Sequence, residues 1–199
     1  MSEATPTRSV VLEMKDERRA MHDGYVFLDE KCLLLAGEML RELERYDALQ
    51  RAFATAYAAA IDRLRDAIAR HGLHGLEVYP GADAGQTTIA RKTRALMGVP
   101  LQDAVLAGDP PAAARAIDAS PEAEACRRAF AAISSAAAPL AAVSGNLTRL
   151  SLEYKRSVRR ARALQDVLLP ELDRDVRELE TRLEELEQED AIWMRHGRS

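Results

Sequence analysis

Two stretches of this sequence carry an apolar residue at every third or fourth position, and this spacing constrains the fold more than any other feature. Near the N-terminus the stripe comprises Val11, Met14, Met21, Tyr25, Leu28, Cys32, Leu35 and Met39, with Arg18 as its one polar member, and it continues less regularly through Leu43, Tyr46, Leu49, Phe53, Tyr57, Ala60, Leu64 and Ile68. Near the C-terminus it comprises Leu147, Leu150, Tyr154, Val158, Ala161, Leu164 or Gln165, Leu168, Leu172, Val176, Leu179, Leu183 and Leu186. Because steps that average close to 3.5 residues keep such a stripe on one side of a helix, each stretch predicts a long helix packed along a partner helix.

The two predicted helices are expected to pack against each other. The segment between them, residues 73–120, is rich in glycine and proline, which favour turns and irregular structure. Since this segment reverses the chain, the helices run antiparallel, and each buries the stripe of the other without a second copy of the chain. The predicted fold is therefore all-α, dominated by a long antiparallel two-helix coiled coil, with a small β-hairpin and irregular segment at the turn end. Its regions are the N-terminal long helix (residues 1–72), the end region (residues 73–120) and the C-terminal long helix (residues 121–199).

Local signals place the ends of these helices. Thr7 or Ser9 is a suitable N-cap for the first helix, and Gly72 is expected to end it just beyond its last turn. Ser120 followed by Pro121 predicts the start of the second helix, because serine caps helix N-termini and proline fits the first helical position.

Within the end region, alternation of residue types predicts the hairpin. Residues 76–79 alternate like a strand, and residues 87–90 and 95–97 are the candidates for its partner across a loop at 80–86. A short helix is expected within residues 101–119.

Two prolines lie inside the second predicted helix. Pro139, with Gly145, predicts a kink or break near residues 138–146. Pro170 removes a backbone hydrogen bond to the carbonyl of Asp166, at a cost of about 3 kcal/mol. A bend is therefore predicted at Pro170.

Composition and motifs argue against several classes of function. The net charge is −4, so no overall basic field indicates nucleic acid, and the N-terminus lacks the apolar core of a signal peptide. No phosphate-binding loop, dinucleotide fingerprint or zinc-protease motif is present, so we expect no catalytic residue and no cofactor. His71 and His74 lack a convincing third ligand, and a solvated helix end is favoured there over a metal site. No stretch approaches a membrane span of about 20 apolar residues, and the cysteines lack CxxC spacing and are expected to be free thiols.

A dense basic run in the second helix and an apolar C-terminal tip are the candidate contact surfaces. The basic run consists of Lys155, Arg156, Arg159, Arg160 and Arg162. Three interpretations stay open for it: a solvated flank of the coiled coil, a docking patch for an acidic protein, and a nucleic-acid arm. The tip carries Ile192 and Trp193, the only tryptophan, and we expect a partner to cover it because a fraying terminus rarely keeps such a residue exposed.

Three segments of the sequence resemble the central-stalk D subunit of V-type and archaeal A-type rotary ATPases, including the bacterial V/A-type ATP synthases. The first is Pro6-Thr7-Arg8 followed by a helix containing GYVFLDEKCLLL, the second is Met97-Gly98-Val99-Pro100, and the third is RRARALQDVLLPELDRDVRELETRLEELEQED. Together they span almost the whole chain in the order found in the family, although residues 104–120 have no counterpart.

The resemblance implies the rotor shaft of an ion-translocating complex, cytoplasmic and peripheral to the membrane, without a nucleotide site of its own. Val10, Val11, Ile192 and Trp193 would then lie inside the hexamer of A and B subunits, where ATP is made or hydrolysed. The outer flank would bind the small F subunit, and the end region would face the funnel-shaped subunit on the membrane rotor ring, which transports protons or sodium ions. The bend at Pro170 would help place the catalytic sites in different states. The alternative is a coiled-coil adaptor or scaffold that homodimerises.

Overall fold

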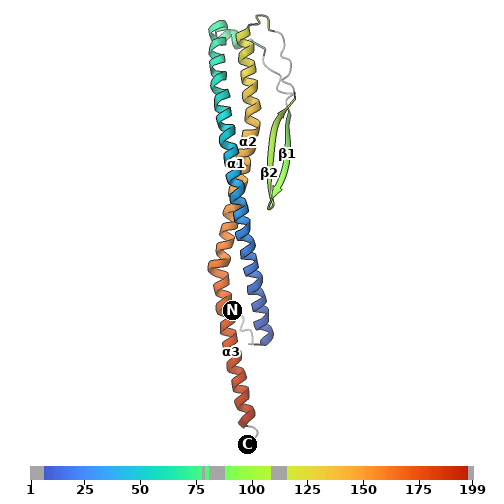
Figure 1. The fold of residues 1–199 in the computed structure, drawn as a ribbon, viewed down its shortest axis with the longest axis vertical. Coiled ribbons are helices and arrows are strands. Elements are labelled where there is room, and N and C mark those ends of the chain that lie inside the picture. Colours follow the sequence, from blue (N-terminus) through green and yellow to red (C-terminus); the bar gives the residue numbers. More distant parts are fainter. Residues whose placement is uncertain (1–6, 78, 81–87, 109–115, 197–199) are drawn as a thin grey trace. The chain divides into compact units, whose positions relative to one another are not determined.

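The computed structural model describes residues 7–77, 79–80, 88–108 and 116–196, and helices dominate it. Helix α1 spans Arg8–Glu77. A second continuous helical run comprises α2 (Pro121–Ala163), the π-helical segment η2 (Leu164–Leu168) and α3 (Leu169–His196). Between these runs, strands β1 (Thr88–Leu96) and β2 (Val99–Ala107) form an antiparallel sheet (Figure 1). The predicted fold class, two long helical segments with a small β-hairpin between them, is confirmed.

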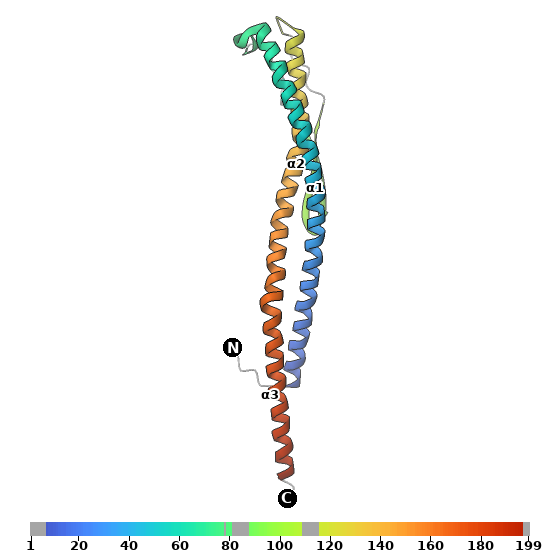
Figure 2. The ribbon, with the colours of Figure 1, turned by 60° about the vertical axis from the view of Figure 1, so that its left-hand side comes forward.

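The chain divides into two compact units. Unit 1 comprises residues 1–34 and 154–199, and unit 2 comprises residues 35–153. In unit 1 the first part of α1 lies beside α3, as both views show (Figures 1 and 2). Their antiparallel direction follows from three ion pairs in which residue numbers rise along α1 and fall along α3: Arg8–Glu187, Lys15–Glu180 and Arg18–Asp173.

The apolar stripe forms the interior of each unit. In unit 1, Val11, Ala161 and Val176 are buried, whereas Leu12, outside the stripe, is 62% exposed. In unit 2 the buried stripe members include Leu35, Ala60 and Leu150. The period of the stripe therefore identified the packed side of each helix.

Four apolar members of the stripe are exposed rather than packed: Leu43, Tyr57, Leu168 and Leu186. Two of them have a local explanation. Leu43 is 47% exposed, and the neighbouring Glu42 is buried in its place, because α1 uses a polar contact at this level. Leu168 is 40% exposed, whereas Leu169 is half-buried, because η2 adds one residue to the turn that precedes α3.

The two predicted N-caps are confirmed, whereas Gly72 interrupts α1 without ending it. The Val10 N–H donates to the Thr7 hydroxyl, and the Ala123 N–H donates to the Ser120 hydroxyl at 3.1 Å, so both residues act as N-caps. Gly72 is the one residue with non-helical dihedral angles inside α1, with φ at +70°, which glycine adopts without steric cost. Helical structure then resumes and continues to Glu77.

The predicted hairpin exists, and residues 88–90 and 95–96 of its predicted segments lie in β1, but the strand predicted at 76–79 was wrong. Residues 76 and 77 are helical, the strands are β1 and β2, and residues 101–107 belong to β2 rather than to a helix. The turn is Met97-Gly98, where both residues have positive φ, at 48° and 83°, and Leu96 pairs with Val99. Positive φ at both central residues is the geometry of a type I′ turn, which matches the twist of the strands it joins. The expected loop at 80–86 lies almost wholly outside the described residues.

The prolines of the second helical run differ in their surroundings. α2 is continuous through Pro139 and Gly145, so the predicted break is absent there. Just before Pro170, the Leu169 N–H donates to the Leu164 carbonyl, five residues back, and η2 forms. A π-helical turn is a recognised cause of helix kinks, so the local irregularity lies where the sequence predicts it, while the bend itself stays a prediction.

By length and composition alone, the helical run 121–196 contains a stretch apolar enough to cross a membrane, with a mean hydropathy of 1.3 over 18 residues. The expectation that no such stretch exists was therefore wrong on these two criteria. The alanine-rich part of α2 accounts for the difference, because alanine raises mean hydropathy while contributing little apolar side-chain area.

Candidate functional site: a buried polar junction and exposed surfaces

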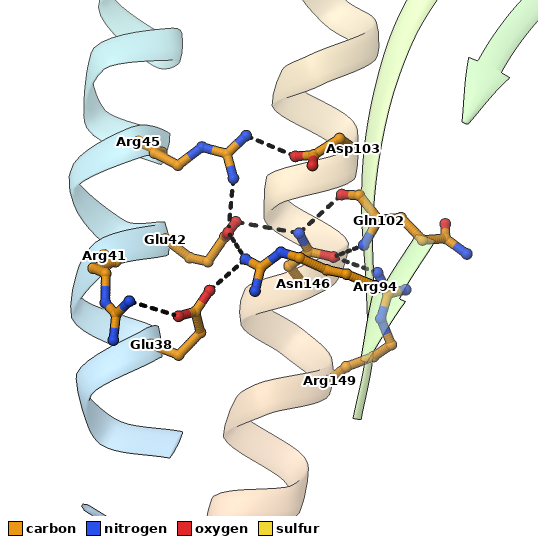
Figure 3. Close-up of polar contacts among 9 residues, drawn as sticks. All are labelled: Glu38, Arg41, Glu42, Arg45, Arg94, Gln102, Asp103, Asn146 and Arg149. Atoms are coloured by element: carbon orange, nitrogen blue, oxygen red, sulfur yellow. Dashed lines mark hydrogen bonds and ion pairs between the residues drawn. The ribbon is translucent and has the colours of Figure 1, made fainter. Parts of the chain in front are cut away.

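Two glutamates of α1 are buried within unit 2. Glu38 is 5% exposed and Glu42 is 1% exposed. Both carboxylates point towards the β-hairpin and α2, as the close-up shows (Figure 3). Because a buried carboxylate is costly without charged and hydrogen-bonding partners, their surroundings determine whether this part of the fold is stable.

Three arginines contact these carboxylates, and the longest contact is that of the exposed Arg41, 3.5 Å from Glu38. Arg94 of β1 contacts Glu38 and lies 3.0 Å from the Glu42 carboxylate. Arg45 of α1 bridges Glu42, at 2.8 Å, and Asp103 of β2, at 2.7 Å. The hydrogen bond to Glu38 raises the pKa of Arg94, and the hydrogen bond to Asp103 raises the pKa of Arg45, so both guanidinium groups remain charged. The ion pairs therefore join both strands of the hairpin to α1.

Asn146 of α2 joins the hairpin to the second helix through its side-chain amide. Its Oδ1 accepts from the Gln102 N–H at 2.8 Å, and its Nδ2 donates to the Gln102 carbonyl at 2.9 Å. Nδ2 also donates to Glu42, and Oδ1 also accepts from Arg149. Asn146 is 1% exposed and uses all of its hydrogen-bonding capacity, taking the place of a neighbouring strand at one position of β2.

This polar junction is a structural site, and the sequence analysis missed it. A signal was present, since Glu38 and Glu42 follow Leu35 at steps of three and four and so continue the seam of α1. Polar residues at seam positions often specify register or partner. In this chain they determine where the hairpin packs against both helices.

The residues of the predicted basic run are all exposed. They are Lys155, Arg156, Arg159, Arg160 and Arg162, at the end of α2 within unit 1. Ser157 and Ala161, between them, are buried, so the basic side chains occupy the outward sides of a helix whose inner side is packed. None of the ion pairs within the described ranges involves these five residues.

The remaining candidate contact residues fall into two groups. Val11 is buried and Val10 is half-buried, so both contribute to packing within unit 1. Ile192 and Trp193 are exposed by 55% and 78%, and Pro170 is exposed as well. The apolar tip of α3 is therefore available to a partner.

The histidines do not form a metal site within the part of the chain that the structure describes, which contains no suitable group of three ligands. The sequence suggested that His71 lies at a solvated helix end, but the structure shows otherwise. Its side chain is buried, and its Nε2 lies 2.6 Å from the Ser120 hydroxyl, so it ties the end of α1 to the cap of α2. His74 is exposed beside Glu77.

Comparison with known proteins agrees with this architecture. The family model for the D subunit of ATP synthase matches residues 10–196. The D subunit of the A-type ATP synthase of Thermococcus sibiricus is 27% identical over 194 residues, which cover 96% of this chain and 91% of that protein. The protein of the same name from Methanopyrus kandleri is 24% identical over 198 residues, covering 98% of this chain and 85% of that protein. Since the matched range contains the hairpin turn and nearly all of both helical runs, the chain belongs to the family of ATP synthase D subunits.

Proposed function

We propose that this chain is the central rotor shaft of a V/A-type rotary ATPase or ATP synthase. It couples ATP synthesis or hydrolysis in the hexamer of A and B subunits to proton or sodium ion transport by the membrane ring. The chain is a non-catalytic member of the complex, so mechanical contacts, rather than side-chain chemistry, carry its function.

The ion-pair ladder of unit 1 is the observation that most supports this role. Arg8 and Lys15 are seven residues apart on α1, and their partners Glu187 and Glu180 are seven residues apart on α3. An equal period on two antiparallel helices fixes their register over successive heptads. A shaft needs such a register, because slippage between its helices would dissipate torque.

The exposed surfaces suit transient contact with surrounding subunits. Charged outer faces favour weak and changing contacts, whereas a large apolar patch would favour permanent adhesion. The tip with Ile192 and Trp193 is proposed to lie within the A/B hexamer. The basic run is proposed to meet the small F subunit, and the hairpin end is proposed to face the funnel-shaped subunit of the rotor ring.

Direct observation of rotation tests the proposal. The A/B hexamer is reconstituted with this chain, and a bead is attached through a cysteine introduced at Ala95, an exposed residue near the hairpin turn. Cys32 and Cys126 are replaced by serine, so that the label is specific. The bead is expected to rotate in one direction when ATP is supplied and to stop when ATP is exhausted. A stationary bead during sustained ATP hydrolysis would refute the shaft.

The homodimeric adaptor makes a different prediction. In unit 1 the seam residues Val11, Ala161 and Val176 are already buried within one chain, which leaves that seam closed to a second copy. Sedimentation of the isolated chain is therefore expected to give a monomer, or a one-to-one complex when the small F subunit is added. A stable dimer of the chain alone would favour the adaptor.

A further inference from the structure

Strand β1 presents an open edge. Every residue of β1 except Leu96 is exposed, and Figure 1 shows β1 on the side of β2 that faces away from α2. An unprotected edge strand offers backbone donors and acceptors to any chain that can pair with it.

The register identifies which backbone groups face outwards. Gln102 directs both its N–H and its carbonyl to Asn146 and so away from β1, which makes its pairing with Thr93 a pair without mutual hydrogen bonds. Pro100, which has no N–H to donate, pairs with Ala95 and fits the same alternation. The N–H and carbonyl groups of Ile89, Arg91, Thr93 and Ala95 therefore point to the free edge. Within the described residues, none of these groups has a hydrogen-bond partner.

The charge on this edge has one sign. The basic residues of the described hairpin are Arg91, Lys92 and Arg94, and its single acidic residue is Asp103. Arg94 and Asp103 are engaged in the junction, whereas Arg91 and Lys92 are in no ion pair among the described residues. The edge thus carries two free cations on consecutive residues, one on each face of the sheet, in a chain whose net charge is −4.

We propose that β1 is a docking site for an extended acidic segment of a partner protein, which adds to the hairpin as a third strand. Backbone hydrogen bonds at Ile89, Arg91, Thr93 and Ala95 supply the pairing, and two consecutive acidic residues opposite Arg91 and Lys92 set the register. A second copy of this chain is disfavoured as the occupant, because pairing β1 with itself brings like charges together. The inference does not depend on the shaft role and holds for any complex that contains the chain.

Amide exchange tests the proposal on the full-length chain. The probe is a capped peptide as long as β1, nine residues, made of valine and threonine with two central glutamates. In the free chain the amides of Ala90, Lys92 and Arg94 are expected to be protected, and those of Ile89, Arg91, Thr93 and Ala95 to exchange quickly. The acidic peptide should slow the second set. A control peptide with two lysines in place of the glutamates should bind at least about tenfold more weakly.

A proline scan separates strand addition from simple charge attraction. Thr93→Pro removes one outward N–H and leaves the bonds between β1 and β2 in place, as Pro100 already does on β2. It should weaken peptide binding about tenfold or more, whereas the matched control Thr93→Val should not. Retained protection of the Lys92 and Arg94 amides verifies that the hairpin is intact. The double variant Arg91→Glu and Lys92→Glu should reverse the preference towards the lysine peptide.

Several results would overturn the proposal. If the acidic peptide leaves the four outward amides unprotected, the two cations serve only to prevent the edge from pairing. Equal binding of both peptides, or binding that Thr93→Pro leaves unchanged, would exclude an added acidic strand. Tighter binding of a single-stranded RNA than of the acidic peptide at the same ionic strength would assign the surface to nucleic acid instead.

Discussion

Replacing Asn146 by aspartate provides the sharpest test of how the hairpin is held. The substitution Asn146→Asp keeps the shape of the side chain and removes the two hydrogen bonds that Nδ2 donates, to the Gln102 carbonyl and to Glu42. It also places a new carboxylate against the carboxylate of Glu42, which is 1% exposed. The bond to the Gln102 N–H survives, and the attraction to Arg149, 2.7 Å away, increases.

The magnitude follows from these contacts. Each buried acceptor that loses its donor costs about 1–3 kcal/mol. Disrupting a buried ionic network by one partner costs about 3–5 kcal/mol, and the stronger contact with Arg149 offsets part of this. We therefore expect unit 2 to lose about 3 kcal/mol of stability at neutral pH.

The loss should depend on pH in one direction. Burial and the nearby Glu42 raise the pKa of the introduced carboxyl group above its value in the unfolded chain, about 3.9. Because the pKa is higher in the folded state, the charged carboxylate destabilises the fold fully at a pH above the folded-state pKa. This destabilisation disappears as the pH falls below the pKa of the unfolded chain. Acidification should thus reduce the difference in the free energy of unfolding between the variant and the wild-type chain.

Urea denaturation followed by circular dichroism, combined with exchange of the β1 and β2 amides, measures the effect. Thr148→Asp is the matched control, because it makes a carboxylate at an exposed position of the same helix. It should cost less than about 0.5 kcal/mol. If Asn146→Asp destabilises the chain no more than this control, the bidentate contact with Gln102 does not hold the hairpin.

Further predictions concern other parts of the chain. Lys15→Glu should lower the free energy of unfolding in urea by only about 0.5 kcal/mol, because its ion pair with Glu180 is exposed. Adding Glu180→Lys should restore the lost stability, and a double variant that stays destabilised would show that the two residues do not pair. Pro170→Ala should change the ratio of ions transported to ATP hydrolysed more than it changes thermal stability, and an unchanged ratio would separate this proline from coupling. Truncation after Asp190 should weaken assembly with the A/B hexamer, as measured by gel filtration. Normal assembly of the truncated chain would show that the tip is not needed for this contact. Burial raises the pKa of the Cys32 thiol, so its alkylation should be slow at pH 7 and accelerate as the pH rises through 9; fast reaction at pH 7 would contradict this.

Periodicity predicted the helical part of the fold well because burial along a two-helix seam repeats with the helix itself. Val11, Leu35 and Leu150 were all assigned correctly to the packed side. The caps at Thr7 and Ser120 were equally predictable, because capping is a local interaction between a side chain and nearby backbone.

The hairpin could not be located in the same way. Its strands lack strict alternation, since β1 is exposed on both faces, and Arg94 rather than an apolar residue faces the helices. Its turn uses Met97 at positive φ, which a sequence rarely signals. The residues that bind the hairpin come from α1 and α2, which are far from it in the sequence, so only the tertiary structure brings them together.

The π-helical segment had a signal of its own in the stripe. Between Ala161 and Val176 the inward positions are Leu164, Leu169 and Leu172, so one step is five residues long where three or four are expected. The sequence pattern was ambiguous at this level, with Leu164 or Gln165 as equal candidates, because a regular helix cannot keep both sides of the insertion in phase. A π-helical turn absorbs the additional residue and returns Leu169 and Leu172 to the packed side. An ambiguous step followed closely by a proline is therefore evidence for an inserted residue in a long helix, and the seam on both sides of it can be assigned with the extra residue included.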